Sequence, residues 1–284
     1  MDADTAACVE ELEQAAGDVS ADPLEIVDVL RSFDAPREAA LIEAAILHMH
    51  NGDDEVRREL AMFLGRVGIE DEALVVAPLV ELMNDDSDAV RYWASYSLGS
   101  LRADNTQIRE AFMEGTGDFD PRVRAECVEA LARRRDQEVA PIVEAALEDP
   151  DELETQYLAA AAWLGLPAFA DALASVVPWD ELSGEFHQAA LERCDPQRST
   201  ARVKALAEVL AEVETAVLAR QPTWSVAMSE HRFGRRPHPS EELSIRDHEG
   251  SVVGYGAWSL LQVRGEGSAS IAAETVMADL FPKE

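Results

Sequence analysis

The chain has 284 residues, 47% of them hydrophobic, and its 56 acidic against 24 basic residues give a net charge of -32 at pH 7. This charge argues against binding to nucleic acid, because contact with a phosphate backbone needs Lys and Arg to replace counterions. It favours solubility and basic partners. Adaptation of the host to salt would produce the same charge. The sequence therefore leaves two explanations of the acidity, a functional one and an adaptation of the host.

Neither a disulfide framework, a metal site nor a membrane span is expected. The three cysteines, Cys8, Cys127 and Cys194, lie far apart and form no CxxC pair. The chain opens without the basic and then apolar pattern of a secretory signal, and its longest uncharged run, residues 157–170, is too short to cross a bilayer. We therefore expect a cytoplasmic protein with no membrane contact, no metal and no cofactor.

The first elements in chain order are three expected helices. Residues 1–20 can form one acidic helix that caps a stack of helices. Asp22-Pro23 begins a second helix, because proline is well accepted in the first turn. A third helix is expected from Pro36 to Asn51-Gly52, a dipeptide typical of a helix end followed by a turn.

A unit of 33 to 34 residues then recurs along the chain. Its marker is a valine that begins an apolar stripe with spacing four, at Val56, Val90 and Val123, which are 34 and 33 residues apart. This spacing places the stripe on one face of a helix, and a second apolar helix follows each time. A repeat of this length is typical of a helical solenoid, in which stacked helix pairs bury each other's stripes. The stripes are Val56, Leu60 and Leu64, then Val90, Ala94 and Leu98, then Val123, Cys127 and Leu131, with N-cap residues Asp53, Ser87 and Asp120.

The repeated pattern is Val-Arg-x-x-x-Ala-x-x-Leu-Gly followed by x-x-Ala-x-Pro-x-Leu-x-x-x-Leu. It resembles the HEAT repeat, and more narrowly the short type found in phycobilisome-lyase-like proteins. The resemblance is good over residues 53–165 and passable over 22–52. It implies that the Val-Arg helices line a concave face. It also implies that Arg57, Arg91 and Arg124 form a polar ladder with acidic groups of neighbouring repeats.

The pattern fades beyond residue 165. A degenerate helix pair is expected over 167–194, followed by a long helix over 199–220. Residues 221–248 are rich in Pro, Arg and His and are interpreted as an irregular excursion, and 249–284 as a terminal helical hairpin, with a short β element near 243–263 as the alternative. The predicted fold is thus an all-α, HEAT-like solenoid over residues 1–220 with these two additions.

Three aromatic side chains, Tyr92, Trp93 and Tyr96, lie off the apolar stripe of their repeat. Two of the neighbouring copies place polar residues in these columns, so the aromatics have no expected role in the repeat core. Aromatic anchors ringed by charge are typical of protein interfaces. The alternative is that the rings pack against residues 221–248 or against a neighbouring repeat. The predicted partner-binding site consists of Tyr92, Trp93, Tyr96, Met62, Glu59, Glu126 and Glu129.

A second candidate is a basic cluster within the excursion, with three arginines and no acid. Arginine forks bind carboxylates and phosphates in pairs of hydrogen bonds, so the cluster could contact an anion or an acidic peptide. The alternative is an internal clasp on the protein's own acidic surface. The residues concerned are His231, Arg232, Arg235, Arg236 and His238.

No catalytic motif stands out in the sequence. HExxH, GxSxG, GxGxxG and P-loop patterns are missing, and His48 and His50 face different sides of a helix. We predict a non-catalytic, protein-binding scaffold or adaptor with an acidic concave face, an aromatic centre and a partner whose surface is basic. One alternative is an acidic inhibitor or immunity protein that blocks a basic toxin or nuclease. A second alternative, from the resemblance, is a chromophore lyase-like enzyme.

Overall fold

The computed structural model describes residues 3–18, 20–33, 36, 38–68, 71–149, 153–233, 236–249 and 252–256. The chain divides into two compact units, Met1–Asp136 and Gln137–Glu284. The domain boundary expected near residue 220 stays a prediction. Within the ranges given, no helix is long and apolar enough to cross a membrane.

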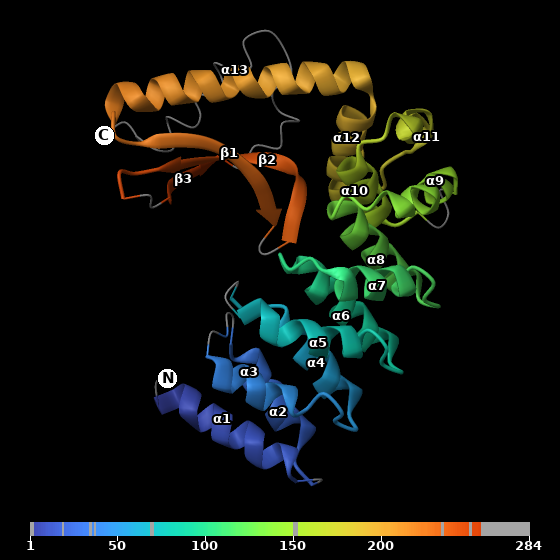
Figure 1. The fold of residues 1–284 in the computed structure, drawn as a ribbon, viewed down its shortest axis with the longest axis vertical. Coiled ribbons are helices and arrows are strands. Elements are labelled where there is room, and N and C mark those ends of the chain that lie inside the picture. The colour runs from blue at the N-terminus through green and yellow to red at the C-terminus, as the bar shows by residue number, and fades with distance from the viewer. Residues whose placement is uncertain are drawn as a thin grey trace. The chain divides into compact units, whose positions relative to one another are not determined.

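The first unit consists of helix pairs stacked in chain order (Figure 1). Helices α2, α4, α6 and α8 pack on one another in one row, and α1, α3, α5 and α7 form the second row. This arrangement confirms the predicted α-helical solenoid. The bounds are α1 Ala3–Ala16, α2 Pro23–Arg31, α3 Ala39–Ile46, α4 Asp54–Leu64, α5 Glu72–Leu82, α6 Asp88–Ser100, α7 Thr106–Gly115 and α8 Pro121–Arg133.

The predicted apolar stripes form the core of this unit. Every residue of the three stripes is at most 1% exposed, including Cys127. Asp53 and Asp120 cap their helices by accepting backbone N–H groups, whereas the Ser87 hydroxyl donates to Asp54 Oδ2 at 3.0 Å instead. Adjacent helices also approach closely, because a Cβ added at Gly65 would overlap the Ser97 side chain. The period of the sequence thus sets both the burial and the spacing of the helices.

Bidentate ion pairs join successive repeats, as the resemblance implied. Arg57 donates to the Asp85 carboxylate at 2.6 and 2.8 Å, and Arg91 donates to the Asp118 carboxylate at 2.7 and 3.0 Å. Burial opposes ionisation of these two acids, but hydrogen bonds from the arginine and from a backbone N–H hold the pKa of Asp85 and of Asp118 below its ordinary value. Arg124 instead donates to backbone carbonyls.

Asn51 occupies the position that Asp85 and Asp118 hold in the following repeats. Like them, it accepts a hydrogen bond from the backbone N–H two residues further on. Arg57 lies 28 residues before Asp85, and the residue 28 positions before Asn51 is Pro23, which carries no charge. An uncharged amide is therefore sufficient there, because a partly buried carboxylate without a partner would destabilise the fold.

The second unit combines helices with a three-stranded sheet. Helix α10 packs on α12, and α13 packs on α12 and on β1. Val209, Val213 and Val217 of α13 are buried. The elements are α9 Ala140–Glu148, α10 Thr155–Leu164, α11 Ala170–Ser175, α12 Glu181–Cys194, α13 Pro196–Arg220, β1 Ser225–Phe233, β2 Arg236–Arg246 and β3 Val252–Gly256, with 3-10 turns at Gln137–Val139 and Pro167–Phe169.

The sheet corrects two predictions. Residues 221–248 are not an irregular excursion, because β1 and β2 form an antiparallel hairpin in which Val226 lies opposite Ile245. The helix expected from Val252 is also wrong as far as Gly256, because these residues form β3. The register also pairs Met228 with Leu243, so apolar residues stand opposite each other across the hairpin, and Ile245 is fully buried. Residues 257–284, the rest of the predicted terminal hairpin, lie outside the described residues.

Candidate functional site

The three aromatics of α6, called here the aromatic cluster (Tyr92, Trp93 and Tyr96), contact one another in a row. The Tyr92 and Trp93 ring centroids are 5.3 Å apart and those of Trp93 and Tyr96 are 5.4 Å apart, with interplanar angles of 74° in both pairs. Edge-to-face contacts of this kind are favourable. All three side chains are partly exposed. The cluster is therefore a preorganised apolar surface that solvent can reach.

An arginine of the next repeat covers one end of the cluster. The Arg122 guanidinium lies 5.5 Å from the centre of the Tyr92 ring and donates to the Asp120 carboxylate at 3.1 and 2.6 Å. It also lies 3.6 Å from the carboxylate of Asp88, whose side chain is 59% exposed. Hydrogen bonding by Arg122 lowers the pKa of Asp120 to about 2. An arginine held between an aromatic face and carboxylates is thus already part of this surface.

The three glutamates predicted to form an acidic rim around the aromatic cluster are buried. Glu59, Glu126 and Glu129 are 2%, 2% and 4% exposed, so these carboxylates face the protein instead of solvent. Glu59 accepts a hydrogen bond from Arg31 at 2.9 Å and lies 3.7 Å from Arg66. Glu59 thus contacts α2, an adjacent helix of the same row, and the polarity of its position in the repeat does not reveal that contact.

The neighbouring helix α4 contributes a partly exposed thioether and a paired arginine. Met62 is half-buried, and Arg58 donates to Glu55 at 2.6 Å. Arg31 donates to the same carboxylate at 3.0 Å. The acids beside the aromatic cluster are therefore largely paired with the chain's own arginines. Sequence reasoning missed Arg122. In the repeat, Arg122 is level with Ala89, which lies in the helical turn that precedes Tyr92.

The basic cluster can be placed only by its backbone. Arg232 belongs to β1 and Arg236 to β2, and the register pairs Arg232 with Pro237 and Phe233 with Arg236. The side chains of His231, Arg232, Arg235, Arg236 and His238 lie outside the described residues. An anion contact by this cluster stays a prediction.

Two cysteines and one histidine, which could in principle take part in chemistry, are buried in the protein core. Burial raises the pKa of the Cys127 and Cys194 thiols to about 12, so neither is a thiolate near neutral pH. His48 is 1% exposed and its Nε2 lies 3.0 Å from the Leu12 carbonyl oxygen. Among the residues that the structure describes, no three His, Cys, Asp or Glu side chains are grouped to hold a metal ion.

Comparison with known proteins agrees with this architecture. The family profile described as HEAT repeats matches residues 76–164 and 109–181. Protein YibA of Escherichia coli K12 is 25% identical over 103 residues, which are 36% of each chain, so the match spans about a third of that relative's length. The likeness to phycobilisome-lyase-like proteins stays a prediction.

Two solved structures are similar at lower sequence identity. The X-ray structure of E. coli YibA has 19% identity, covers 61% of this chain and 68% of its own, and gives a TM-score of 0.45. A designed armadillo repeat protein in complex with the peptide (KR)4 has 18% identity, 66% and 91% coverage and a TM-score of 0.43. Residues 76–181 are thus similar to HEAT repeats, and the helix pairs of the first unit form an α-helical solenoid.

Proposed function

We propose that the protein is a non-catalytic, protein-binding scaffold whose partner docks on the aromatic cluster of α6. Helical repeats support this proposal, because stacked repeats present an extended surface that is suited to binding. The observation that carries it is the aromatic cluster itself, whose three rings are partly exposed while the stripe of the same helix fills the core. Aromatic side chains that bury well on binding commonly dominate the energetics of an interface.

The chemistry around Tyr92 favours a partner segment that carries arginine. Arg122 already covers Tyr92, so an incoming guanidinium would stack on Trp93 or Tyr96. The net charge of -32 would attract such a segment at long range and raise its rate of association. Carboxylates near the cluster are mostly paired, so we expect stacking to supply more of the affinity than new ion pairs.

A labelled peptide of alternating arginine and alanine tests the site by fluorescence anisotropy. Trp93→Ala combined with Tyr96→Ala should weaken binding about thirtyfold or more, because truncation of even one central aromatic commonly costs about 2 kcal/mol. The melting temperature should stay within a few degrees, because both rings are partly exposed.

Trp179→Ala is the control, since it removes an aromatic that is 49% exposed just before α12 in the second unit. A loss of binding in this variant equal to that in the cluster variant would contradict the proposed site. A cluster variant that melts much lower but binds normally per folded molecule would show that the rings serve packing.

A further inference from the structure

Arg122 is not one of the arginines that the repeat pattern requires. The ladder arginines directly follow the valine that begins a stripe, whereas Arg122 directly precedes Val123. The two preceding repeats hold Glu55 and Ala89 at that position. The cap of α8 does not depend on the side chain either, because the backbone N–H of Arg122 donates to Asp120 at 2.8 Å. The side chain is therefore available for a role other than folding.

The Arg122 side chain lies in surroundings that suit a guanidinium group. Its Nε and Nη2 donate to the two oxygens of the Asp120 carboxylate at 3.1 and 2.6 Å, and its guanidinium carbon lies 5.5 Å from the centre of the Tyr92 ring. A second carboxylate, that of Asp88, is 3.6 Å away. Arginine has a planar fork that can pair with a carboxylate while it stacks on a ring. The Tyr92 ring and these two carboxylates thus form a guanidinium site that already holds an occupant.

The occupant is held weakly enough to exchange with another arginine. Arg122 and Asp88 are 53% and 59% exposed. Ion pairs and cation–π contacts at exposed positions are weak, because water screens the charges. The covered ring also contacts Trp93, with centroids 5.3 Å apart, so it belongs to the surface on which the partner is proposed to dock. An arginine of the partner would therefore compete with Arg122 for the same ring.

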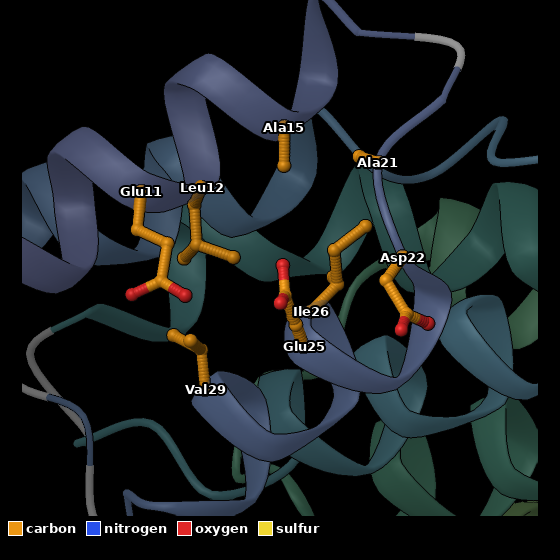
Figure 2. Close-up of a pocket in the computed structure, with 8 residues that line it drawn as sticks. All are labelled: Glu11, Leu12, Ala15, Ala21, Asp22, Glu25, Ile26 and Val29. Atoms are coloured by element: carbon orange, nitrogen blue, oxygen red, sulfur yellow. The ribbon is translucent and has the colours of Figure 1, made fainter.

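Acidic residues without an aromatic ring do not make an equivalent site. Glu11 of α1 and Glu25 of α2 border a hollow whose lining includes Leu12 and Ile26 (Figure 2). The space inside measures about 20 Å³, which is room for about one water molecule, and none of the residues that line it is aromatic. An arginine can approach this surface only by general attraction to its charge. Residues 11–26 therefore provide a reference for such attraction.

We propose that Arg122 is an internal competitor, which occupies the guanidinium site on Tyr92 in the free protein and excludes an arginine of the partner from it. This inference rests on the proposed function, because it takes arginine as the ligand of the aromatic cluster. A single arginine of the partner is then directed to Trp93 or Tyr96. A segment with a second arginine within reach of Tyr92 must displace Arg122, which lowers the affinity for arginine-rich segments and narrows the choice of partner.

Binding of the labelled arginine–alanine peptide, measured by fluorescence anisotropy, tests the competition. Arg122→Ala should tighten binding about three- to tenfold, because it opens the Tyr92 ring to the peptide. Arg102→Ala is the matched control, since it removes the same charge from an exposed position just after α6 and should change the affinity less than about twofold. In a Tyr92→Leu background, Arg122→Ala should bring no such gain, because no ring is left to open. Circular dichroism confirms that each variant folds.

An NMR titration of the full-length, 15N-labelled protein with N-acetyl-arginine N-methylamide locates the site directly. In Arg122→Ala, saturable shifts should include the backbone amides of residues 120–123, because the analogue then binds between Tyr92 and Asp120. The wild type should show no saturable shift of these amides, since Arg122 fills the site. Amides of residues 11–26 should show no saturation in either protein, as expected of general attraction to charge.

Three results would overturn the inference. One is unchanged or weaker peptide binding in Arg122→Ala, and another is an equal gain in Arg102→Ala. The third is a titration of Arg122→Ala without saturable shifts at residues 120–123, which decides the matter even if the peptide binds neither protein. Peptide binding that Trp93→Ala with Tyr96→Ala leaves unchanged would instead contradict the proposed function, so the two failures can be told apart.

Discussion

Truncation of Leu98 to alanine tests the register on which the whole repeat reading depends. Leu98 is the last residue of the α6 stripe, its side chain is fully buried, and α6 packs between α4 and α8. The change removes three carbon atoms, and at about 0.8 kcal/mol for each the loss of hydrophobic transfer energy is about 2.4 kcal/mol. Neighbouring helices on both sides limit collapse of the cavity, so we expect a total near 3–4 kcal/mol, within the usual range of about 2–5 kcal/mol.

The free energy of unfolding can be measured by urea titration followed by far-ultraviolet circular dichroism. A lower midpoint with an unchanged slope would show that stability fell and that the denatured state stayed the same. Leu74→Ala on α5 is the control, because Leu74 is 37% exposed and loses less buried area. A cost for Leu98→Ala below about 0.5 kcal/mol would mean that this stripe faces solvent, and the assigned register would be refuted.

Three further predictions concern charge. Arg91→Met should destabilise the fold by about 3 kcal/mol in thermal or urea unfolding, because it leaves the Asp118 carboxylate, 10% exposed, without its partner. Adding Asp118→Asn should restore part of this stability. A further loss of stability in the double variant would contradict the ladder. The pKa of Asp85 and of Asp118 lies below its ordinary value of 3.8, so their contribution is fully present above pH 3.8 and is lost as the pH falls through the lowered values. A melting curve in acid should show this loss, and Arg91→Met should bring it to higher pH. Duplex DNA should show no gel shift at physiological salt, and micromolar binding would overturn the charge argument.

His48 gives a separate pH test near neutrality. Burial lowers its pKa below the ordinary value of 6.5, so the folded state holds the neutral ring. Its contribution to stability is therefore present above pH 6.5 and is lost as the pH falls through the lowered pKa. Melting temperatures at pH 7.5 and 5 should differ more for the wild type than for His48→Gln. An equal difference in the two proteins would assign the effect to other groups.

The helical part of the fold could be predicted because its signals are local and repeated. Val56, Val90 and Val123 begin stripes that are buried as their spacing requires, and the positions of Arg57 and Arg91 recur at the same period. Three copies of one pattern make a chance match improbable, since cap, period and turn residues agree in each.

The sheet and the burial of the site glutamates could not be predicted in the same way. Val226 meets Ile245 across a hairpin, so each strand is satisfied by residues far along the chain and not by its own period. Pro237 and Pro239, which lie within β2, and the arginines of the segment made it resemble a loop. Glu59 is buried because Arg31 reaches it from α2, where the repeat pattern is weak. A polar residue in a repeat column says nothing about which neighbour neutralises it.

The ion pairs between repeats bear on how such an array can change length. Arg57 reaches forward 28 residues to Asp85, and Arg91 reaches forward 27 residues to Asp118. The repeat that contains Arg91 thus supplies a donor to the next repeat and an acceptor to the one before. A duplicated copy inserted at this point would find both partners in place, so the array could grow by tandem duplication without leaving a charge unmatched. Asn51, which has no arginine behind it, is the substitution that would let such an array terminate.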